Sequence, residues 1–424
     1  MPESMSGRFA KLWTASTLSA LGTGLTVIAA PLYVSARTSN ALIVSATTGV
    51  AMLPWLLFAL PAGVLVDRVD RRRLMVAVDW ARAAAMGVLA VAILSGWSSV
   101  ILLDLVLFLI NMGETAFEPA AQSMIPAVVP RDQLERANGW LVGGLTLTRY
   151  MIAGPLGGFM FVVAASIPFF ANAGTYAASA VLVGLVGGKY RVTRPGQSPS
   201  PEAGGPPRWR AAGAGIRAEV AEGLRWLLRQ RMLRTMAVLI GLLNVTLAAA
   251  TAVLVLLARE RLHVGSVGYG SLFTCMAAGS LLGSAVGDRV IRRVTATWTI
   301  RIGLVVEALT HLTLALATSV YVVGAVMVAF GIHAALWTIV GSSLRQRLTP
   351  EHMLGRVSSA TLFISASGEC AGALLGGALA GAFGITAPYW VGFAVALIVV
   401  ATTWRVFDRT TVAAAYAEPA VAQT

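Results

Sequence analysis

Charged side chains within long apolar segments are the residues of this sequence whose types and positions suggest chemistry. Glu114 and Arg149 lie in two consecutive apolar segments, residues 98–121 and 139–165. A charge inside a membrane costs about 2.5 to 3.5 kcal/mol on insertion scales, so such groups face the protein interior and are functional candidates by default. At about 1.5 Å per residue, Glu114 lies about 10 Å and Arg149 about 15 Å from the same membrane face. We expect these two side chains to form a salt bridge.

This pair suits the binding of a proton. Arginine stabilises the charged carboxylate, and loss of the arginine contact in one conformation would favour the protonated carboxyl group through desolvation. The proton would then follow the conformation of the protein. A static structural pair is the alternative, because buried ion pairs are often retained for packing specificity.

Further ionisable residues in apolar segments are candidates of the same kind. Glu369 lies about 220 residues after Arg149, at a similar depth, and is a second candidate for proton or cation binding. Glu307 and His311 are spaced i, i+4, share one helix face and would bind a proton jointly, although a satisfied buried histidine is the commoner case. Asp104 lies near the opposite membrane face, where a carboxylate attracts cations.

A second close pair is interpreted as structural. Asp79 and Arg82 are spaced i, i+3, so they neutralise each other on one helix face near the cytoplasm. No H-E-x-x-H zinc motif and no nucleophile–base set stands out, and Cys275 and Cys370 lie within apolar runs. The sequence therefore favours neither an enzyme nor a metal site, and no cofactor is expected.

The elements that position these charges are membrane-spanning helices. The sequence is 57% hydrophobic and 12% charged, against about 25% charged in soluble domains. Apolar runs of about 20 residues, enough to cross a bilayer as a helix, recur twelve times. The continuous apolar pattern excludes a β-barrel, so we expect an all-α integral membrane protein. The predicted spans are 12–36, 42–66, 74–95, 98–121, 139–165, 167–187, 233–258, 267–287, 297–318, 320–343, 359–383 and 387–407.

The net charge of +13 reports topology rather than nucleic-acid binding. Most basic residues fall in alternate loops, and positively charged loops remain on the cytoplasmic side. We therefore expect both termini in the cytoplasm, a bacterial inner-membrane location and contact between the loop arginines and anionic lipids. Nucleic acid is not an expected partner.

Three short segments recur in order at an offset of about 220 residues. The run from Asp67 matches that from Asp288, the run from Pro130 matches that from Pro350, and one Gly-Gly pair at 157–158 matches another at 376–377. Such repetition indicates two six-helix bundles in parallel pseudo-repeat, a transporter architecture. The predicted domains are 1–187, a cytoplasmic linker 188–232 with an amphipathic helix near 216–231, and 233–424.

The loop after the second predicted span resembles the signature of the major facilitator superfamily, G-x-L-x-D-R-x-x-R-[KR]. The resemblance implies the major facilitator fold, with rocking halves that expose a central cavity to alternate sides of the membrane. Asp67 would act as a conformational latch, while the arginines of the loop also set topology. The expected switch-loop residues are Gly63, Asp67, Arg68, Arg71 and Arg72, with Asp288 and Arg289 in the second copy.

Other segments resemble the twelve-helix drug:proton antiporter branch, specifically macrolide-efflux and enterobactin-exporter-like proteins. The run Phe117-Glu118-Pro119-Ala120 carries part of this resemblance, and the fifth span is similar to the antiporter motif G-P-x-x-G-G. Phe159 replaces the last glycine of that motif. The resemblance implies export, with Gly154, Pro155, Gly157 and Gly158 forming the antiporter-motif helix.

Aromatic residues in the apolar segments are candidates for lining a broad cavity that admits lipophilic cations. They are Trp55, Phe117, Trp140, Phe330, Trp337 and Phe363. We therefore expect a monomeric secondary transporter that exports a lipophilic drug or natural product in exchange for protons. The alternatives are an exporter of a siderophore, peptide or lipid on the same fold, and a non-transporting membrane sensor.

Overall fold

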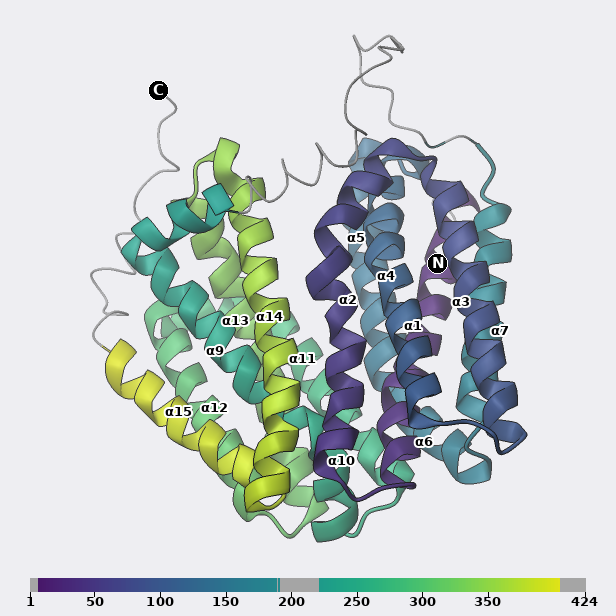
Figure 1. Ribbon diagram of the computed structural model, residues 1–424. Coiled ribbons are helices and arrows are strands. Elements are labelled where there is room, and N and C mark those ends of the chain that lie inside the picture. The colour runs from purple at the N-terminus through teal and green to yellow at the C-terminus, as the bar shows by residue number, and fades with distance from the viewer. Residues whose placement is uncertain (1–6, 189, 191–220, 405–424) are drawn as a thin grey trace, which may run out of the picture. The chain divides into compact units, whose positions relative to one another are not determined.

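The computed structural model describes residues 7–188, 190 and 221–404, which fold almost entirely as helices. Eleven helices of this described part are long and apolar enough to cross a membrane, and α15 (Ala387–Thr403) is a shorter apolar helix that follows them. Each of the twelve predicted spans corresponds to one helical crossing, which confirms the twelve-helix architecture (Figure 1).

The first six crossings use both single helices and one composite helix. They are α1 (Gly7–Ser35), α2 (Ala41–Arg68), α3 (Arg71–Leu94), α4 (Val100–Val128), the composite of α5 (Leu134–Thr146), η2 (Leu147–Ile152) and α6 (Ala153–Val163), and α7 (Ile167–Gly184). A short 3₁₀ turn, η1 (Arg131–Gln133), precedes α5. The η2 segment is a π-helical turn that ends three residues before Pro155, and proline has no N–H to donate to the preceding turn.

The last six crossings follow the same pattern. They are the composite of α9 (Arg231–Ala252), α10 (Leu254–Leu256) and the π-helical turn η3 (Leu257–Arg261), then α11 (Ser266–Val294), α12 (Ala296–Leu316), α13 (Val320–Leu348), α14 (Glu351–Phe383) and α15. Several helices extend beyond the predicted spans, because an apolar run marks the part of a helix within the hydrocarbon but not its polar ends. α4 continues to Val128 and α14 begins at Glu351.

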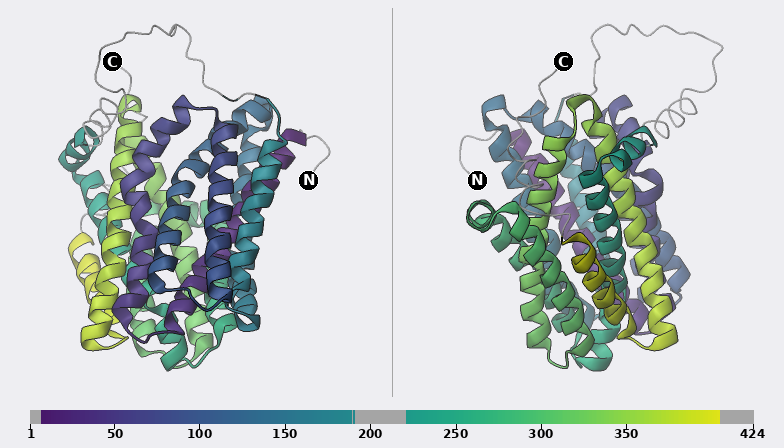
Figure 2. Two further views of the ribbon diagram at one scale, coloured as in Figure 1. Left: turned by 45° about the vertical axis from the view of Figure 1, so that its right-hand side comes forward. Right: turned by 90° about the vertical axis from the view of Figure 1, so that its left-hand side faces the viewer.

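The chain forms two compact units, and neither is a single continuous stretch. The first comprises residues 1–29, 50–153 and 160–219, and the second comprises residues 30–49, 154–159 and 220–424. In the first, α3 packs between α4 and α7; in the second, α9 packs on α14, α11 on α13, and α12 on both α13 and α15 (Figures 1 and 2). The predicted domain boundaries at 187 and 233 remain a prediction.

The described part of the linker contains a short helix at residues 221–229. Leu227 packs with Leu233, Met353 and Val357 in a small buried cluster. Beside it, a guanidinium nitrogen of Arg356 lies 2.7 Å from a carboxylate oxygen of Glu222. The apolar face of this helix therefore packs on the first turns of α14. Residues 216–220 of the predicted amphipathic helix lie outside the described part.

Candidate functional site

A buried cluster of charged side chains in the first unit is centred on Glu114, whose residue is 4% exposed. Arg149 Nη2 donates a hydrogen bond of 2.7 Å to Glu114 Oε1, as the depth argument predicts. Arg82 Nη2 donates to the other carboxylate oxygen, Oε2. Glu114 thus bridges two guanidinium groups, one from α3 and one from η2, and both of its oxygens accept charged hydrogen bonds.

Arg82 links this carboxylate to a second one. Its Nη1 donates to Asp79 Oδ1 at 3.0 Å, which confirms the predicted pair on α3. The same guanidinium also contacts Glu114, so the pair is part of a larger cluster, and its structural role stays a prediction. The orientation of α3 about its own axis turns Arg82 toward α4 and α7, and residue spacing does not reveal that orientation.

Neutral polar groups from two more helices complete the cluster. Tyr176 Oη of α7 accepts a 2.9 Å hydrogen bond from Arg82, and the guanidinium carbon lies 4.0 Å from the centroid of the same ring. Thr23 Oγ1 of α1 donates to Glu114 Oε2 at 3.1 Å and lies 3.0 Å from Tyr176 Oη. These contacts fix the buried guanidinium by both hydrogen bonding and ring stacking.

Glu118 is the member of the cluster that the sequence interpretation missed. Arg149 Nη1 donates to Glu118 Oε1 at 2.9 Å, and the Glu118 side chain is 33% exposed, against 6% for Glu114. The i, i+4 spacing places both carboxylates on one face of α4. Both also line a cavity of about 80 Å³ next to Phe117.

The composition of the cluster leaves one carboxylate in excess. Asp79, Glu114 and Glu118 contribute three carboxylates, whereas Arg82 and Arg149 contribute two guanidinium groups. Full ionisation therefore gives one net negative charge in a largely desolvated site, and one bound proton would make the cluster neutral. Glu118 has a single guanidinium partner and the greatest exposure, so it is the carboxylate most accessible to a proton.

The loop between α2 and α3 connects the start of α3 to the end of the sixth crossing. Asp70 caps α3: its Oδ1 accepts from the backbone N–H of Arg73, and its Oδ2 accepts from the backbone N–H of Tyr190, both at 3.0 Å. Burial raises the pKa of Asp70. The two backbone hydrogen bonds and the charges of Arg73 and Arg72 together lower it by more, so the pKa lies below its ordinary value.

Two arginines of this loop hold neighbouring helices. Arg72 donates to the carbonyl oxygens of Gly184, the last residue of α7, and of Gly188 beyond it, at 2.6 and 3.2 Å. The helix dipole also favours a cation at this end. Arg71 Nη1 donates to Ser123 O of α4 at 2.9 Å. The predicted switch loop is therefore a junction of three helices.

The remaining predicted switch-loop residues lie in α2 and in the second copy of the loop. The side chain of Asp67 lies outside the described part of the structure, whereas Gly63 and Arg68 occupy the last turns of α2. In the second copy, Asp288 pairs with Arg292 on the exposed surface of α11, next to an exposed Arg289. This pair lies within one helix, unlike the bonds of the first copy.

The antiporter-motif helix makes close backbone contacts within the second unit. A Cβ atom added to Gly154 would lie 2.4 Å from Gly270 O, and one added to Gly158 would lie 2.3 Å from Ser266 O. Glycine is therefore required where α6 crosses α11. Gly157 is also buried, and Pro155 is partly buried beside it.

A second buried polar cluster lies between α12 and α13. His311 Nε2 is 3.4 Å from Glu307 Oε1, and His333 Nε2 is 3.5 Å from Glu307 Oε2. The ring of His333 lies between Phe330 and Trp337, at centroid distances of 6.0 and 6.2 Å. The structure thus joins the predicted pair to a third titratable residue, His333.

The other predicted residues lie apart from both clusters. Glu369 is partly buried in α14 and makes no ion pair with the described residues, and Asp104 precedes Glu114 by ten residues, about 15 Å along α4. Among the aromatic candidates, Trp140 packs edge-on against Trp13, and Phe363 is 42% exposed. Trp55 is partly buried in α2.

Comparison with known proteins agrees with this architecture. The family described as transmembrane secretion effector matches residues 5–422. The multidrug efflux pump Tap of Mycobacterium tuberculosis is 28% identical over 405 residues, covering 92% of this chain and 90% of that protein. Macrolide efflux protein A of Streptococcus pyogenes is 29% identical over 133 residues, a match that covers 31% of this chain and about a third (33%) of that protein.

Solved structures show the same fold at low sequence identity. The crystal structure of a mutant of the nucleoside transporter NupG has a TM-score of 0.73 at 12% identity and covers 95% of this chain and all (100%) of that one. A bacterial homologue of the iron transporter ferroportin in an inward-facing state has a TM-score of 0.71 at 16% identity, with coverage of 95% and 99%.

Proposed function

Since this chain belongs to the transmembrane secretion effector family of the major facilitator superfamily, we propose that it exports lipophilic drugs or natural products in exchange for protons. The observation that carries this proposal is the buried cluster in which three carboxylates face two guanidinium groups. The fold and the named relatives support membrane transport of a small molecule, and the cluster supplies a group whose charge can change during the cycle.

Proton binding at this cluster alters the bonds that hold five crossings together. A proton on Glu118 removes the charge that attracts Arg149 and leaves Glu114 as the partner of both arginines. Because Arg149 lies in the π-helical turn directly before the antiporter-motif helix, a change in its bonding acts on that helix. The proton and the conformation are therefore coupled, as exchange of cargo for protons requires.

The proposal includes a location and an orientation. We place the protein in a bacterial inner membrane as a monomer, with both termini in the cytoplasm and the loop arginines next to anionic lipids. Its partners are a lipophilic small molecule and protons. Among the described residues no cluster of three or more histidine, cysteine, aspartate or glutamate side chains is arranged to hold a metal ion.

Transport into inverted membrane vesicles tests the function. Radiolabelled erythromycin, chosen because two relatives are named macrolide efflux proteins, should accumulate when a proton gradient is imposed and cease to accumulate when the protonophore CCCP dissipates both the pH gradient and the membrane potential. Glu114→Gln should abolish uphill accumulation while exchange down a concentration gradient persists. Glu260→Gln, at an exposed position of η3, is the matched control and should behave as wild type. Accumulation that survives gradient collapse would exclude proton coupling.

A further inference from the structure

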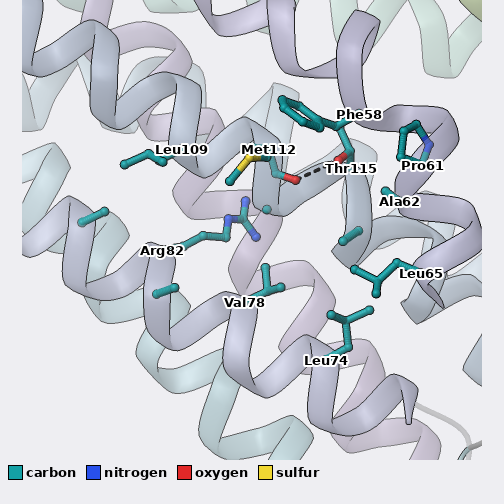
Figure 3. A pocket seen from close by; sticks show the side chains of 14 residues that line it. Phe58, Pro61, Ala62, Leu65, Leu74, Val78, Arg82, Leu109, Met112 and Thr115 are labelled. Carbon is teal, nitrogen blue, oxygen red and sulfur yellow. Dashed lines mark hydrogen bonds between the residues drawn. The ribbon is translucent and has the colours of Figure 1, made fainter. Parts of the chain in front are cut away.

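A cavity of about 420 Å³ lies within the first unit, between α2, α3 and α4 (Figure 3). Its volume falls within the range of about 300 to 1,000 Å³ that is typical of small-molecule sites. None of the six aromatic residues suggested by the sequence lines it. The lining residues are Phe58, Pro61, Ala62, Leu65, Leu74, Val78, Ala81, Arg82, Ala85, Leu109, Met112, Gly113, Thr115 and Ala116.

The walls of the cavity are almost entirely apolar. Thr115, the one hydroxyl-bearing residue of the lining, donates its proton to the carbonyl oxygen of Met112 at 2.7 Å within α4. Among the described residues of the lining, Arg82 alone has a charged side chain and none is a carboxylate. The charge of Arg82 is already balanced by Asp79 and Glu114 behind the wall, so the lining offers no unpaired charge to an ionic ligand. An uncharged apolar ligand needs none.

Arg82 provides one unused hydrogen-bond donor at this cavity. Its two terminal nitrogens donate to Asp79, Glu114 and Tyr176, but its buried Nε–H has no acceptor among the described residues. Figure 3 shows the Arg82 side chain extending between Met112 and Val78. Buried donors normally find a partner, because leaving one without an acceptor is unfavourable.

A glycine makes room for this arrangement. A Cβ atom at Gly113 would lie 2.9 Å from Arg82 Cδ and 3.0 Å from a methyl group of Val78. Any larger residue at position 113 would push the arginine stem away from α4. The close approach of α3 and α4 therefore holds Arg82 against the cavity while its terminal nitrogens remain on the charge cluster.

We propose that this cavity binds uncharged lipophilic molecules that carry a hydrogen-bond acceptor, and that the acceptor receives the Nε–H of Arg82. The rim residues Pro61, Leu65, Ala81 and Leu109 are exposed, so a ligand enters between membrane-spanning helices past apolar side chains. Occupancy is coupled to the charge cluster, because the arginine that bonds the ligand also bonds Glu114.

The assignment of this ligand as cargo rests on the proposed efflux function, but the site itself does not. A binding measurement on the purified full chain in lipid nanodiscs, without any gradient, separates the two. Retained binding with no proton-driven transport would overturn the efflux function alone. Proton-driven transport with no binding at this cavity would overturn the site alone.

Photolabelling with benzophenone is the test. Benzophenone is uncharged, carries one carbonyl acceptor and, on irradiation near 350 nm, attaches to neighbouring C–H groups that mass spectrometry then locates. We expect labelling to concentrate on the cavity side chains Met112, Phe58 and Leu65. Labelling spread evenly over the exposed apolar faces of other helices, with no enrichment at these residues, would overturn the proposal.

Two substitutions on one helix make a matched pair. Ala85→Trp fills the cavity and should reduce cavity labelling at least tenfold, whereas Val88→Trp, at a 55% exposed position of α3 outside the lining, should leave it unchanged. Thermal unfolding verifies that each variant is folded. If Ala85→Trp does not fold, Ala62→Leu, from the α2 wall, replaces it and should reduce labelling severalfold. Unchanged labelling in a folded filling variant would overturn the site.

Competition tests the hydrogen bond. Phenyl benzoate and bibenzyl have similar shapes, but only the ester has carbonyl and ester oxygens that accept hydrogen bonds. After correction for partition into lipid, phenyl benzoate should displace benzophenone at least tenfold better than bibenzyl from the wild-type protein. Arg82→Lys keeps the charge and removes the Nε–H, so the ratio should fall toward one. Equal competition by both compounds in the wild type would overturn the assigned role of Nε.

Discussion

The exposure of Glu118 distinguishes it from the other carboxylates of the buried cluster and leads to the first prediction. Glu118→Gln removes the excess carboxylate and leaves the two salt bridges of Glu114 with Arg82 and Arg149 intact. We expect proton-driven efflux into inverted vesicles to fall at least tenfold and to lose its dependence on pH, because the cluster is already neutral.

Glu118→Asp is the control for this prediction, since it retains the carboxylate at a shorter reach and should keep a pH-dependent, slower efflux. A Glu118→Gln variant that retains the wild-type pH profile would remove Glu118 from the coupling mechanism and return that role to Glu114.

Tyr176 stabilises the buried guanidinium of Arg82, which leads to a second prediction. Tyr176→Phe keeps the ring below the Arg82 guanidinium but removes the hydroxyl that accepts its hydrogen bond. The loss of a partner for a buried charged donor costs about 1 to 3 kcal/mol, so thermal unfolding of the purified protein should occur several degrees lower. Tyr321→Phe, at an 86% exposed position, should leave the unfolding temperature unchanged, and equal shifts in the two variants would contradict the argument.

Among the elements, α3 depends on the charge of its capping residue. The pKa of Asp70 is lowered in the folded protein from its ordinary value of 3.8. The folded state therefore binds fewer protons than the unfolded state near that pH. The resulting stability is present above pH 3.8 and is lost as the pH falls through the lower, folded-state pKa.

Asp70→Asn isolates this charge because asparagine keeps one acceptor oxygen. We expect the variant to be less stable than wild type by about 1 kcal/mol at neutral pH, because its side-chain nitrogen cannot accept the hydrogen bond from the backbone N–H of Tyr190. The difference should shrink as the pH falls below 3.8, the ordinary pKa of an aspartate. Denaturant titrations of the two proteins at several pH values measure it. A difference that stays constant down to pH 2 would show that the charge of Asp70 does not contribute.

The contact between α6 and α11 gives a matched pair of glycine substitutions. Gly158→Ala places a methyl group against Ser266 O, whereas Gly174→Ala, in α7, meets nothing within 4 Å. Overpacking costs about 1 to 3 kcal/mol, while alanine in an open helix position gains up to about 1 kcal/mol over glycine. Thermal unfolding should therefore shift down for the first variant and not for the second; equal behaviour would mean that the close contact is dispensable.

The positions of the helices in the sequence were predictable, whereas the rotation of each helix about its own axis was not. Each crossing is a long apolar run, and the Glu114–Arg149 pair follows from depth on consecutive antiparallel helices. Glu118 lies within the predicted span 98–121, but it was considered only as part of the run Phe117-Glu118-Pro119-Ala120 and not as an ionisable candidate. Arg82 was assigned only to its neighbour on α3, since spacing along one helix does not show which other helix a side chain faces.

The cavity near Arg82 was also beyond prediction from sequence, for a related reason. Its lining combines small and branched apolar side chains from α2, α3 and α4, and none of them is unusual for a membrane-spanning helix. Aromatic residues drew attention because they are large, but a cavity forms where large side chains are absent. Ala62, Ala85 and Gly113 would have been the informative residues.

At the scale of the whole molecule, the two buried polar clusters have different charge balances. The cluster of the first unit has one carboxylate more than it has guanidinium groups, so it becomes neutral when it binds one proton. In the second unit, Glu307 faces two imidazoles, and a single protonated histidine neutralises it. We therefore expect the first cluster to determine the number of protons exchanged, which is one per cycle.

This stoichiometry, together with an uncharged cargo, predicts that each cycle moves one positive charge across the membrane. A membrane potential contributes about 2.3 kcal/mol per charge at 100 mV, so potential alone should drive efflux. In inverted vesicles with equal pH on both sides, a potassium diffusion potential set by valinomycin, positive inside, should drive accumulation of the uncharged antibiotic chloramphenicol, used as the probe. Glu118→Gln should lose this response, because its cluster no longer changes charge. A wild-type response to a pH gradient but not to the potential would contradict the exchange of one proton for an uncharged molecule, since only an electroneutral cycle is insensitive to the potential.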